Sequence, residues 1–400
     1  MSKIKNFLVI PLILSLVSCG SVISSSSSSS VVTSSSSTST IVVSSTSVEI
    51  DDSYKETDEV SGETKIVLAD SGSTINGSGA TITNNVVSIS DGGTYYISGS
   101  LSEGQIIVTS TNKTTPVHLI LDGVNLTCSS SSPIYVTKAK ADVIITLKEG
   151  TTSTLTDGSS YILNEDEEPT ATIFSKDNLV FNGTGTLKIN SNYNDAIKSK
   201  DSLYILGGNF IINSVDDGII GKDLVSISDG TFNITSGGDA IKASNDTDEG
   251  SGIVSIEKGD FTINATADAI QAVSLLQING GTYNITTGGG AKNTSTNSGW
   301  GQWGGTSSTA STDSAKGLKA DGHILIKDGT YTMSTSDDAL HCNGSLQIDG
   351  GTFEIKSGDD GIHADSDVVI NSGNINISQS YEGIEGYTVT INGGLIYVTA

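Results

Sequence analysis

The chain has 400 residues, and its 45 acidic and 20 basic side chains give a formal net charge of −25 at pH 7. All basic residues are lysines, because the sequence contains no arginine. So acidic a chain is repelled by nucleic-acid phosphates and by anionic lipid headgroups, so we expect no nucleic-acid partner and no electrostatic membrane binding. The three cysteines, Cys19, Cys128 and Cys342, are too few for a disulfide scaffold.

Residues 1–18 are predicted to be a signal peptide. Lys3 and Lys5 precede an apolar run over residues 7–17 that is too short to span a membrane. The run leads into Cys19, so the segment resembles a bacterial lipoprotein signal, in which that cysteine is lipidated. An ordinary signal peptide with an incidental cysteine is the alternative. We expect a lipid anchor at Cys19, on the cell surface at the outer face of the bacterial membrane.

Residues 19–62 are predicted to be a flexible tether, because serine and threonine dominate residues 24–47 and leave too few apolar side chains to fold. Residues 63–400 are predicted to form the folded domain, with irregular first coils to about residue 170 and regular coils over 171–400. Alternating apolar segments of the irregular part are 86–97, 117–126, 134–137 and 143–147.

A repeat fills the rest of the chain. An acidic–small–apolar motif recurs from Asp195-Ala196-Ile197 to Glu382-Gly383-Ile384, with spacings of 22, 22, 29, 48, 22, 22 and 22 residues. Each unit holds three short segments of period-two alternation separated by Gly, Asp and Asn, which indicates strands. Three strands in 22 residues bury their apolar sides only by coiling and stacking on the next unit. The sequence therefore predicts an all-β fold, a parallel β-helix solenoid with coils about 4.8 Å apart.

Stacked coils predict ladders of like residues. One inward position holds only small residues, from Ser199 to Gly386, and Cys342 is one of them. Because Cys342 lies many coils away from Cys128, we expect no disulfide. No capping element follows the strand expected at 395–398, so we expect that end to be covered by a partner or by further chain. An aromatic position is predicted to form a core stack and not a sugar-binding platform: Phe210, Phe232, Phe261, Tyr283, Tyr331 and Phe353.

The outward positions predict a shallow groove along the helix axis. Its floor would be the first outward position, which is Ala or Gly from Ala196 to Gly383. An extended polysaccharide can follow such a groove, because a sugar repeat is of the same order as the coil spacing. One edge is the corner row Asp195, Asp217, Asp239, Asp268, Asp338, Asp360 and Glu382; the other is the outward row Lys198, Ile220, Lys242, Gln271, Lys319, His341, His363 and Glu385.

The corner row also predicts calcium. Two exposed charges about 4.8 Å apart repel by roughly 1 kcal/mol in water, and calcium relieves this by accepting carboxylate oxygens. The alternative is that these Asp residues only accept backbone N–H bonds at turns. We expect several calcium ions, whose number the sequence does not give. The expected ligands are Asp195, Asp216, Asp217, Asp239, Asp246, Asp248, Asp337, Asp338, Asp359, Asp360 and Glu382.

Both tryptophans, Trp300 and Trp303, lie in the glycine-rich insertion 290–315. We expect them to stack on sugar rings, and the alternative is that they anchor the loop on the helix. Tyr193 and Tyr381 at the acidic corner would supplement them. His341 and His363, one coil apart in the outward row, are further candidates for carbohydrate binding, and as a pair they form either a polar ladder or a transition-metal site.

Several motifs resemble a family of bacterial cell-surface carbohydrate-binding proteins: Ser175-Lys176-Asp177, Asn192-Tyr193-Asn194-Asp195, Asp217-Gly218-Ile219-Ile220-Gly221-Lys222-Asp223, Gly238-Asp239-Ala240-Ile241-Lys242, Asp338-Ala339-Leu340-His341 and Ser380-Tyr381-Glu382-Gly383-Ile384-Glu385-Gly386. The similarity runs from about Gly93 onward. It implies a right-handed parallel β-helix that contains calcium, binds cellulose and pectic polymers and is similar in fold to polysaccharide lyases.

The expected function is calcium-stabilised binding of a polysaccharide by a monomer at the cell surface. One alternative is a calcium-dependent pectate lyase, which would need a lysine base because no arginine is present; the candidates are Lys198, Lys242 and Lys319. A second alternative is a structural adhesin that binds another protein.

Overall fold

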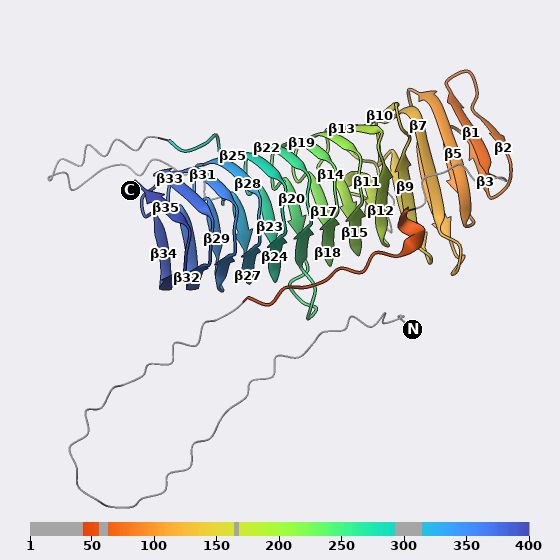
Figure 1. Ribbon diagram of the computed structural model, residues 1–400. Coiled ribbons are helices and arrows are strands. Elements are labelled where there is room, and N and C mark those ends of the chain that lie inside the picture. The colour runs from red at the N-terminus through yellow and green to blue at the C-terminus, as the bar shows by residue number, and fades with distance from the viewer. Residues whose placement is uncertain (1–42, 56–62, 164–167, 293–313, 400) are drawn as a thin grey trace, which may run out of the picture. The chain divides into compact units, whose positions relative to one another are not determined.

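A computed structural model describes residues 43–55, 63–163, 168–292 and 314–399. They form 35 β-strands and one 3-10 helix, η1 (Asp52–Lys55), and the strands hydrogen-bond into one mostly parallel sheet that coils along an axis (Figure 1). This confirms the all-β parallel β-helix. Within these residues no helix has the length and apolar character that a membrane span requires.

Each regular coil has three strands, and each strand pairs in parallel with its counterpart one coil later, so the helix has three faces. The first face contains β11 (Ala171–Ser175), β14 (Asp195–Ser199), β17 (Ile219–Gly221), β20 (Ile241–Ala243), β23 (Ile270–Ala272), β26 (Leu318–Ala320), β29 (Leu340–Cys342), β32 (Ile362–Ile370) and β34 (Ile384–Ile391).

The second face contains β9 (Val143–Leu147), β12 (Leu179–Gly183), β15 (Ser202–Ile205), β18 (Leu224–Ile227), β21 (Ile253–Ile256), β24 (Leu275–Ile278), β27 (His323–Ile326) and β30 (Leu346–Ile348), and it ends in the long β32. The third face contains β10 (Thr152–Asp157), β13 (Thr186–Ser191), β16 (Asn209–Ser214), β19 (Thr231–Ser236), β22 (Asp260–Ala265), β25 (Thr282–Thr287), β28 (Thr330–Thr335), β31 (Thr352–Ser357), β33 (Asn374–Gln379) and β35 (Leu395–Val398).

The first coils differ from the regular ones. Hairpins close this end, because β1 pairs with β2 and β3 with β4 in antiparallel fashion, and parallel pairing takes over from β4 and β5 onward. The strands here are β1 (Thr64–Ala69), β2 (Thr74–Asn76), β3 (Ala80–Thr83), β4 (Val86–Ile89), β5 (Gly93–Leu101), β6 (Gln105–Ser110), β7 (Val117–Cys128) and β8 (Ile134–Ala139).

The core contains the predicted ladders. Six buried rings of the third face, from Phe210 to Phe353, stack with centroids 4.4–5.1 Å apart and planes within 2–5° of parallel. Phe181 meets the first ring edge-on at 5.6 Å and so ends the parallel stack. Cys342 is fully buried in the small-residue ladder, and both it and Cys128 are free thiols.

The predicted groove floor of Ala and Gly residues is wrong. Ala196, Ala240, Ala269 and Ala339 are fully buried and belong to the main hydrophobic core. The chain bends between the third and the first face, so the small residue and the next apolar residue both face inward. Neighbouring corners approach closely there: a Cβ on Gly218 would lie 2.5 Å from the Ala240 carbonyl oxygen.

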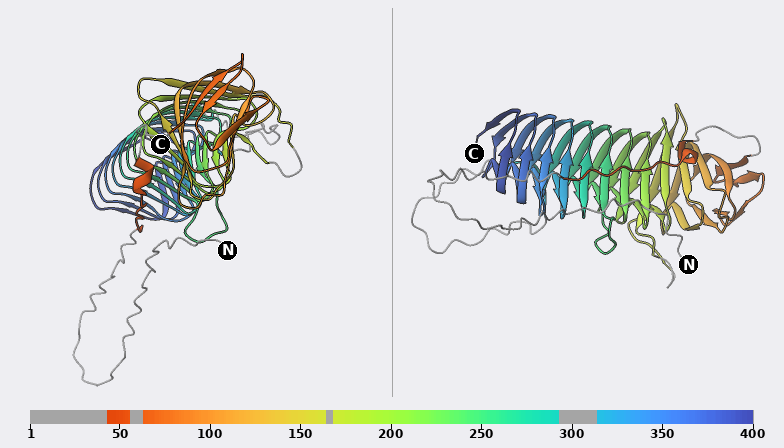
Figure 2. Two further views of the ribbon diagram at one scale, coloured as in Figure 1. Left: turned by 90° about the vertical axis from the view of Figure 1, so that its right-hand side faces the viewer. Right: turned by 60° about the horizontal axis from the view of Figure 1, so that its bottom comes forward.

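Residues 43–55, which fall inside the predicted tether, lie along the second face as an extended strap (Figure 2). The Val43 amide donates to Gln347 Oε1 at 2.9 Å, and the Thr46 amide donates to Gln277 Oε1 at 2.9 Å. At the other end, Tyr54 packs on Tyr204 with centroids 5.3 Å apart, and its hydroxyl donates to Asp142 Oδ2 at 2.7 Å. The strap explains why outward residues of this face are buried.

The last coil exposes apolar side chains. Tyr387 of β34 is 88 % exposed, and Ile391, Leu395 and Tyr397 are more than half exposed. Among the described residues, no further strand pairs with β34 or β35, which leaves these apolar side chains uncovered.

Candidate functional site

The first face positions the predicted outward row in the expected register. Lys198 lies opposite Ile220, Lys242 opposite Gln271, and His341 opposite His363, each pair on adjacent parallel strands. A pocket of about 480 Å³ opens at this corner of the helix and brings carboxylates and ammonium groups together across four coils. Its charged lining residues are Asp216, Asp217, Asp239, Lys242, Asp268 and Lys319.

Each buried corner carboxylate caps the next coil. Asp217 Oδ1 accepts the Asp239 amide at 2.6 Å, and Asp239 Oδ1 accepts the Asp268 amide at 2.9 Å. The same bond recurs from Asp338 to the Asp360 amide at 2.9 Å. The turn-capping interpretation of the Asp row therefore holds for one oxygen of each carboxylate.

The second oxygen of these carboxylates faces an ammonium group. Lys198 Nζ lies 2.8 Å from Asp195 Oδ2, and Lys242 Nζ lies 2.7 Å from Asp239 Oδ2. Lys316, which replaces the acid of the corner row in its own coil, reaches Asp338 Oδ2 at 3.0 Å. The sequence places Lys316 in the corner row. That its side chain pairs with Asp338 of the following coil is visible only in the folded structure.

Burial and charge shift the ionisation of this row in both directions. Burial raises the pKa of Asp217 to about 7. The charge of Lys242 acts to lower this pKa, but its ammonium group is 3.5 Å away and compensates only part of the effect of burial. Burial also acts to raise the pKa of Asp338, but hydrogen bonds from His341 and the charge of Lys316 lower it to about 2. Asp239 and Asp217 raise the pKa of Lys242 although its burial acts in the opposite sense.

The carboxylate cluster that best fits calcium is Asp337, Asp338 and Asp359, each of which offers an oxygen within 4.8 Å of the others. Lys316 Nζ lies 2.8 Å from Asp337 Oδ2, so an ion would have to displace this ammonium. Asp195, Asp217 and Asp239 fit calcium less well, because among the described residues none of them belongs to a group of three carboxylates that could share an ion. Asp216 is exposed, and so is Glu382, whose amide donates to Asp360 Oδ1.

Asp246 and Asp248 lie in an exposed loop that protrudes after β20. Asn245 organises this loop: its Oδ1 accepts the amides of Thr247 and Asp248, and its Nδ2 donates to Asp248 Oδ2 at 2.9 Å. The loop is therefore held by an asparagine turn, and no other described carboxylate completes a three-ligand cluster with these two.

The predicted aromatic contacts separate in space. Tyr193 stacks on Tyr161 with centroids 4.1 Å apart, and Tyr161 donates to Asp157 Oδ2 at 2.7 Å, which fixes a partly exposed aromatic pair near the first regular coils. Tyr381 is 75 % exposed at the other end. Trp300 and Trp303 lie outside the described residues, as does Cys19.

His341 and His363 lie on adjacent coils with ring centroids 4.8 Å apart. His341 Nδ1 is 2.8 Å from Asp338 Oδ2, a normal hydrogen bond. His363 instead faces Asp360 and Glu385, with Nδ1 3.2 Å and 3.5 Å from their carboxylate oxygens. Burial and the Asp338 charge raise the pKa of Asp360.

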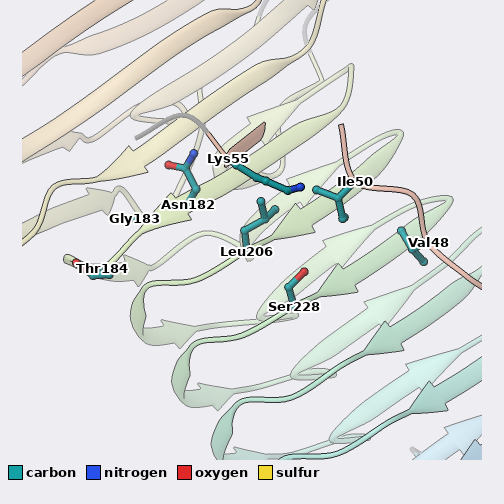
Figure 3. A pocket seen from close by; sticks show the side chains of 8 residues that line it. All are labelled: Val48, Ile50, Lys55, Asn182, Gly183, Thr184, Leu206 and Ser228. Carbon is teal, nitrogen blue, oxygen red and sulfur yellow. The ribbon is translucent and has the colours of Figure 1, made fainter. Parts of the chain in front are cut away.

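A second pocket, of about 610 Å³, lies between the strap and the second face (Figure 3). Val48, Ile50 and Lys55 of the strap line one side, and Leu206 and Ser228 of the coils line the other. The sequence alone does not predict this pocket, because the pocket forms only where the strap lies on the coils. The outward apolar residues Ile144, Val180 and Tyr204 were the available signal that something covers this face.

Comparisons with known proteins identify a family and a similar solved structure. The profile of a family described as carbohydrate-binding domain-containing protein matches residues 83–361. A protein of that description from Acetivibrio thermocellus is 38 % identical over 130 residues, which are 32 % of this chain and 45 % of the relative, so the match spans less than half of the relative.

Among solved structures, a polysaccharide lyase-like protein from C. thermocellum, studied as a gadolinium derivative, is similar with a TM-score of 0.58 and 31 % identity. The similarity covers 66 % of this chain and 96 % of that one. The family profile extends over more than half of the sequence and includes the coils that build the corner pocket. The chain therefore belongs to the family of carbohydrate-binding domain-containing proteins.

Proposed function

We propose that this protein binds an extended polysaccharide of the cellulose or pectic type along the corner of its first face, and does not cleave it. The observation that carries the proposal is the pocket of about 480 Å³, in which carboxylates of three consecutive coils lie with the ammonium groups of Lys242 and Lys319. Carboxylates accept hydrogen bonds from sugar hydroxyls, and lysines pair with uronate carboxylates. The family membership and the lyase-like relative support a polysaccharide as the ligand.

Binding without cleavage is favoured by the state of the lysines. A lysine base needs a depressed pKa, but the pKa of Lys242 is raised by its two aspartates. Lys198 and Lys319 are held at 2.8 Å and 3.0 Å from aspartate oxygens. A lysine held in this way serves as a cation and not as a proton acceptor.

We further propose that calcium binds at Asp337, Asp338 and Asp359, that a lipid on Cys19 holds the protein to the outer face of a bacterial membrane, and that it acts as a monomer. Three clustered carboxylates support the calcium site, and lanthanides such as gadolinium take the hard oxygen ligands that calcium prefers. The apolar run before Cys19 supports the anchor.

Sedimentation of the protein with polygalacturonate and with cellulose, in calcium and in chelator, tests this function. The variant K242M/K319M is expected to lose at least tenfold in affinity for polygalacturonate, because a hydrogen bond to a charged group is worth about 1.5–3 kcal/mol. K188M changes an exposed lysine of the third face and is the matched control, expected to bind as the unmodified chain does.

The same samples, read for absorbance of an unsaturated product at alkaline pH, separate binding from lyase action. We expect a flat trace over hours. Product that disappears in K198A, K242A or K319A alone would replace the binding proposal with the lyase. Binding to neither glycan would favour the adhesin.

A further inference from the structure

The outward row changes character at its last coils. Its lysines neutralise Asp195, Asp239 and Asp268, and in the following coils His341, His363 and Glu385 take the lysine positions. Asp338 still meets an ammonium group, that of Lys316 in the corner row. Over the described residues, no lysine lies within 4.0 Å of Asp360, whose side chain is only 8 % exposed. A buried carboxylate thus faces a second carboxylate and an imidazole, and no ammonium compensates it.

The contacts of His363 with carboxylate oxygens are longer than the hydrogen bond of His341. Charge-assisted bonds between nitrogen and oxygen are about 2.7–2.9 Å long, as between His341 and Asp338. His363 Nδ1 lies 3.2 Å from Asp360 Oδ2 and 3.5 Å from Glu385 Oε2. Two ligands of one tetrahedral zinc ion are about 3.3 Å apart, because each lies about 2.0–2.1 Å from the metal. The imidazole nitrogen is therefore separated from each carboxylate oxygen as two ligands of one ion are, and the donor atoms of the three residues all lie within 4.8 Å of one another.

The other ring nitrogen supports the same interpretation. His363 Nε2 lies 3.4 Å from Asp365 Oδ1. If that nitrogen carries the proton, the Nδ1 lone pair points at two carboxylates, which is unfavourable unless a cation lies between them. Metal-ligating histidines usually face a carboxylate in this way with the nitrogen that does not bind the metal.

We propose that Asp360, His363 and Glu385 bind a divalent transition-metal ion of the zinc class, with Asp365 orienting the imidazole. One nitrogen and two carboxylate donors suit zinc, whereas calcium prefers oxygen ligands only. Three protein ligands leave a fourth position for water or for a ligand oxygen. The site is separate from the proposed calcium cluster and does not depend on the polysaccharide proposal.

Titration calorimetry of the metal-stripped full chain with zinc chloride tests the site. We expect saturable binding that H363Q and E385Q each weaken at least tenfold, and that D365N weakens about 10–100-fold through the imidazole. Glu385 is 46 % exposed, so its replacement leaves the core intact. H323Q and E354Q, which change a histidine and a glutamate outside the cluster, are expected to bind zinc as the unmodified chain does.

Replacement of zinc by cobalt adds a readout of coordination. Absorption bands of cobalt bound to nitrogen and oxygen ligands should appear with the unmodified chain, persist in excess calcium and disappear in H363Q. The absence of zinc binding, or equal affinity in H363Q, E385Q and the control variants, would overturn the proposal. In the first case the His363 imidazole lies between the carboxylates without a metal ion, and in the second the ion binds elsewhere.

Discussion

At the scale of single residues, the corner aspartates combine two tasks. One oxygen caps the backbone of the following coil, and the other interacts with a lysine or histidine of the outward row. Removal of the charge from such a residue keeps the cap, because an asparagine oxygen still accepts the amide. Asp217 is the clearest case, since its cap is short at 2.6 Å and its lysine is distant at 3.5 Å.

D217N should therefore flatten the dependence of stability on pH. Burial raises the pKa of Asp217 from its ordinary value near 4 to about 7, so the folded state holds a proton that the unfolded state releases. Stability from this group is fully present below about pH 4 and declines as the pH rises to about 7, by at most about 4 kcal/mol. Thermal unfolding of both chains between pH 4 and 8 measures this; parallel profiles would contradict it.

At the scale of elements, the helix is held by ladders that cross coils. The aromatic stack and the corner caps each contribute one side chain per coil, so a single substitution disturbs two interfaces between coils. The strap is a further element of this kind, because it contacts coils from β30 to β12 with one segment of the chain.

F261A should destabilise the fold by about 3–5 kcal/mol, because Phe261 is buried between two stacked rings and leaves a cavity that these rings cannot close. Y397A, at an exposed ring of the last coil, is the control and should change stability by less than about 0.5 kcal/mol. Denaturant unfolding measures both. A loss for F261A no larger than that for Y397A would show that the stack adds little.

Y54F should loosen the strap without disturbing the coils. It removes a hydroxyl that donates to Asp142 Oδ2 and keeps the ring on Tyr204, so a loss of about 1.5–3 kcal/mol is expected in the docking of residues 43–55. Limited proteolysis should cleave this segment faster in Y54F, while the digestion of residues beyond 63 stays unchanged. Equal cleavage rates would mean that the strap is held by its other contacts.

At the scale of the whole molecule, the sequence predicts the register of the strands but not which side chains face inward at the corner between the third and the first face. The 22-residue spacing places Phe210 opposite Phe232 without ambiguity, because any slip would break every ladder at once. Strict alternation, however, placed Ala196 outside, and the bend at the corner turns it into the core. The strap was missed because its composition continues the Ser/Thr-rich segment, and its docking depends on side chains far away in sequence, such as Gln347.

Calcium is the prediction that concerns the whole stack, because an ion at Asp337, Asp338 and Asp359 would join two consecutive coils. An ion bound only by the folded state stabilises it by RT ln(1 + [L]/Kd), or about 2.7 kcal/mol at a hundredfold excess over Kd. Calorimetry in calcium and in chelator should show a higher melting temperature with calcium. The gain should vanish in D359N, whose side chain caps no coil, and persist in D260N on the third face. Identical transitions with and without calcium would leave Lys316 as the group that neutralises this corner.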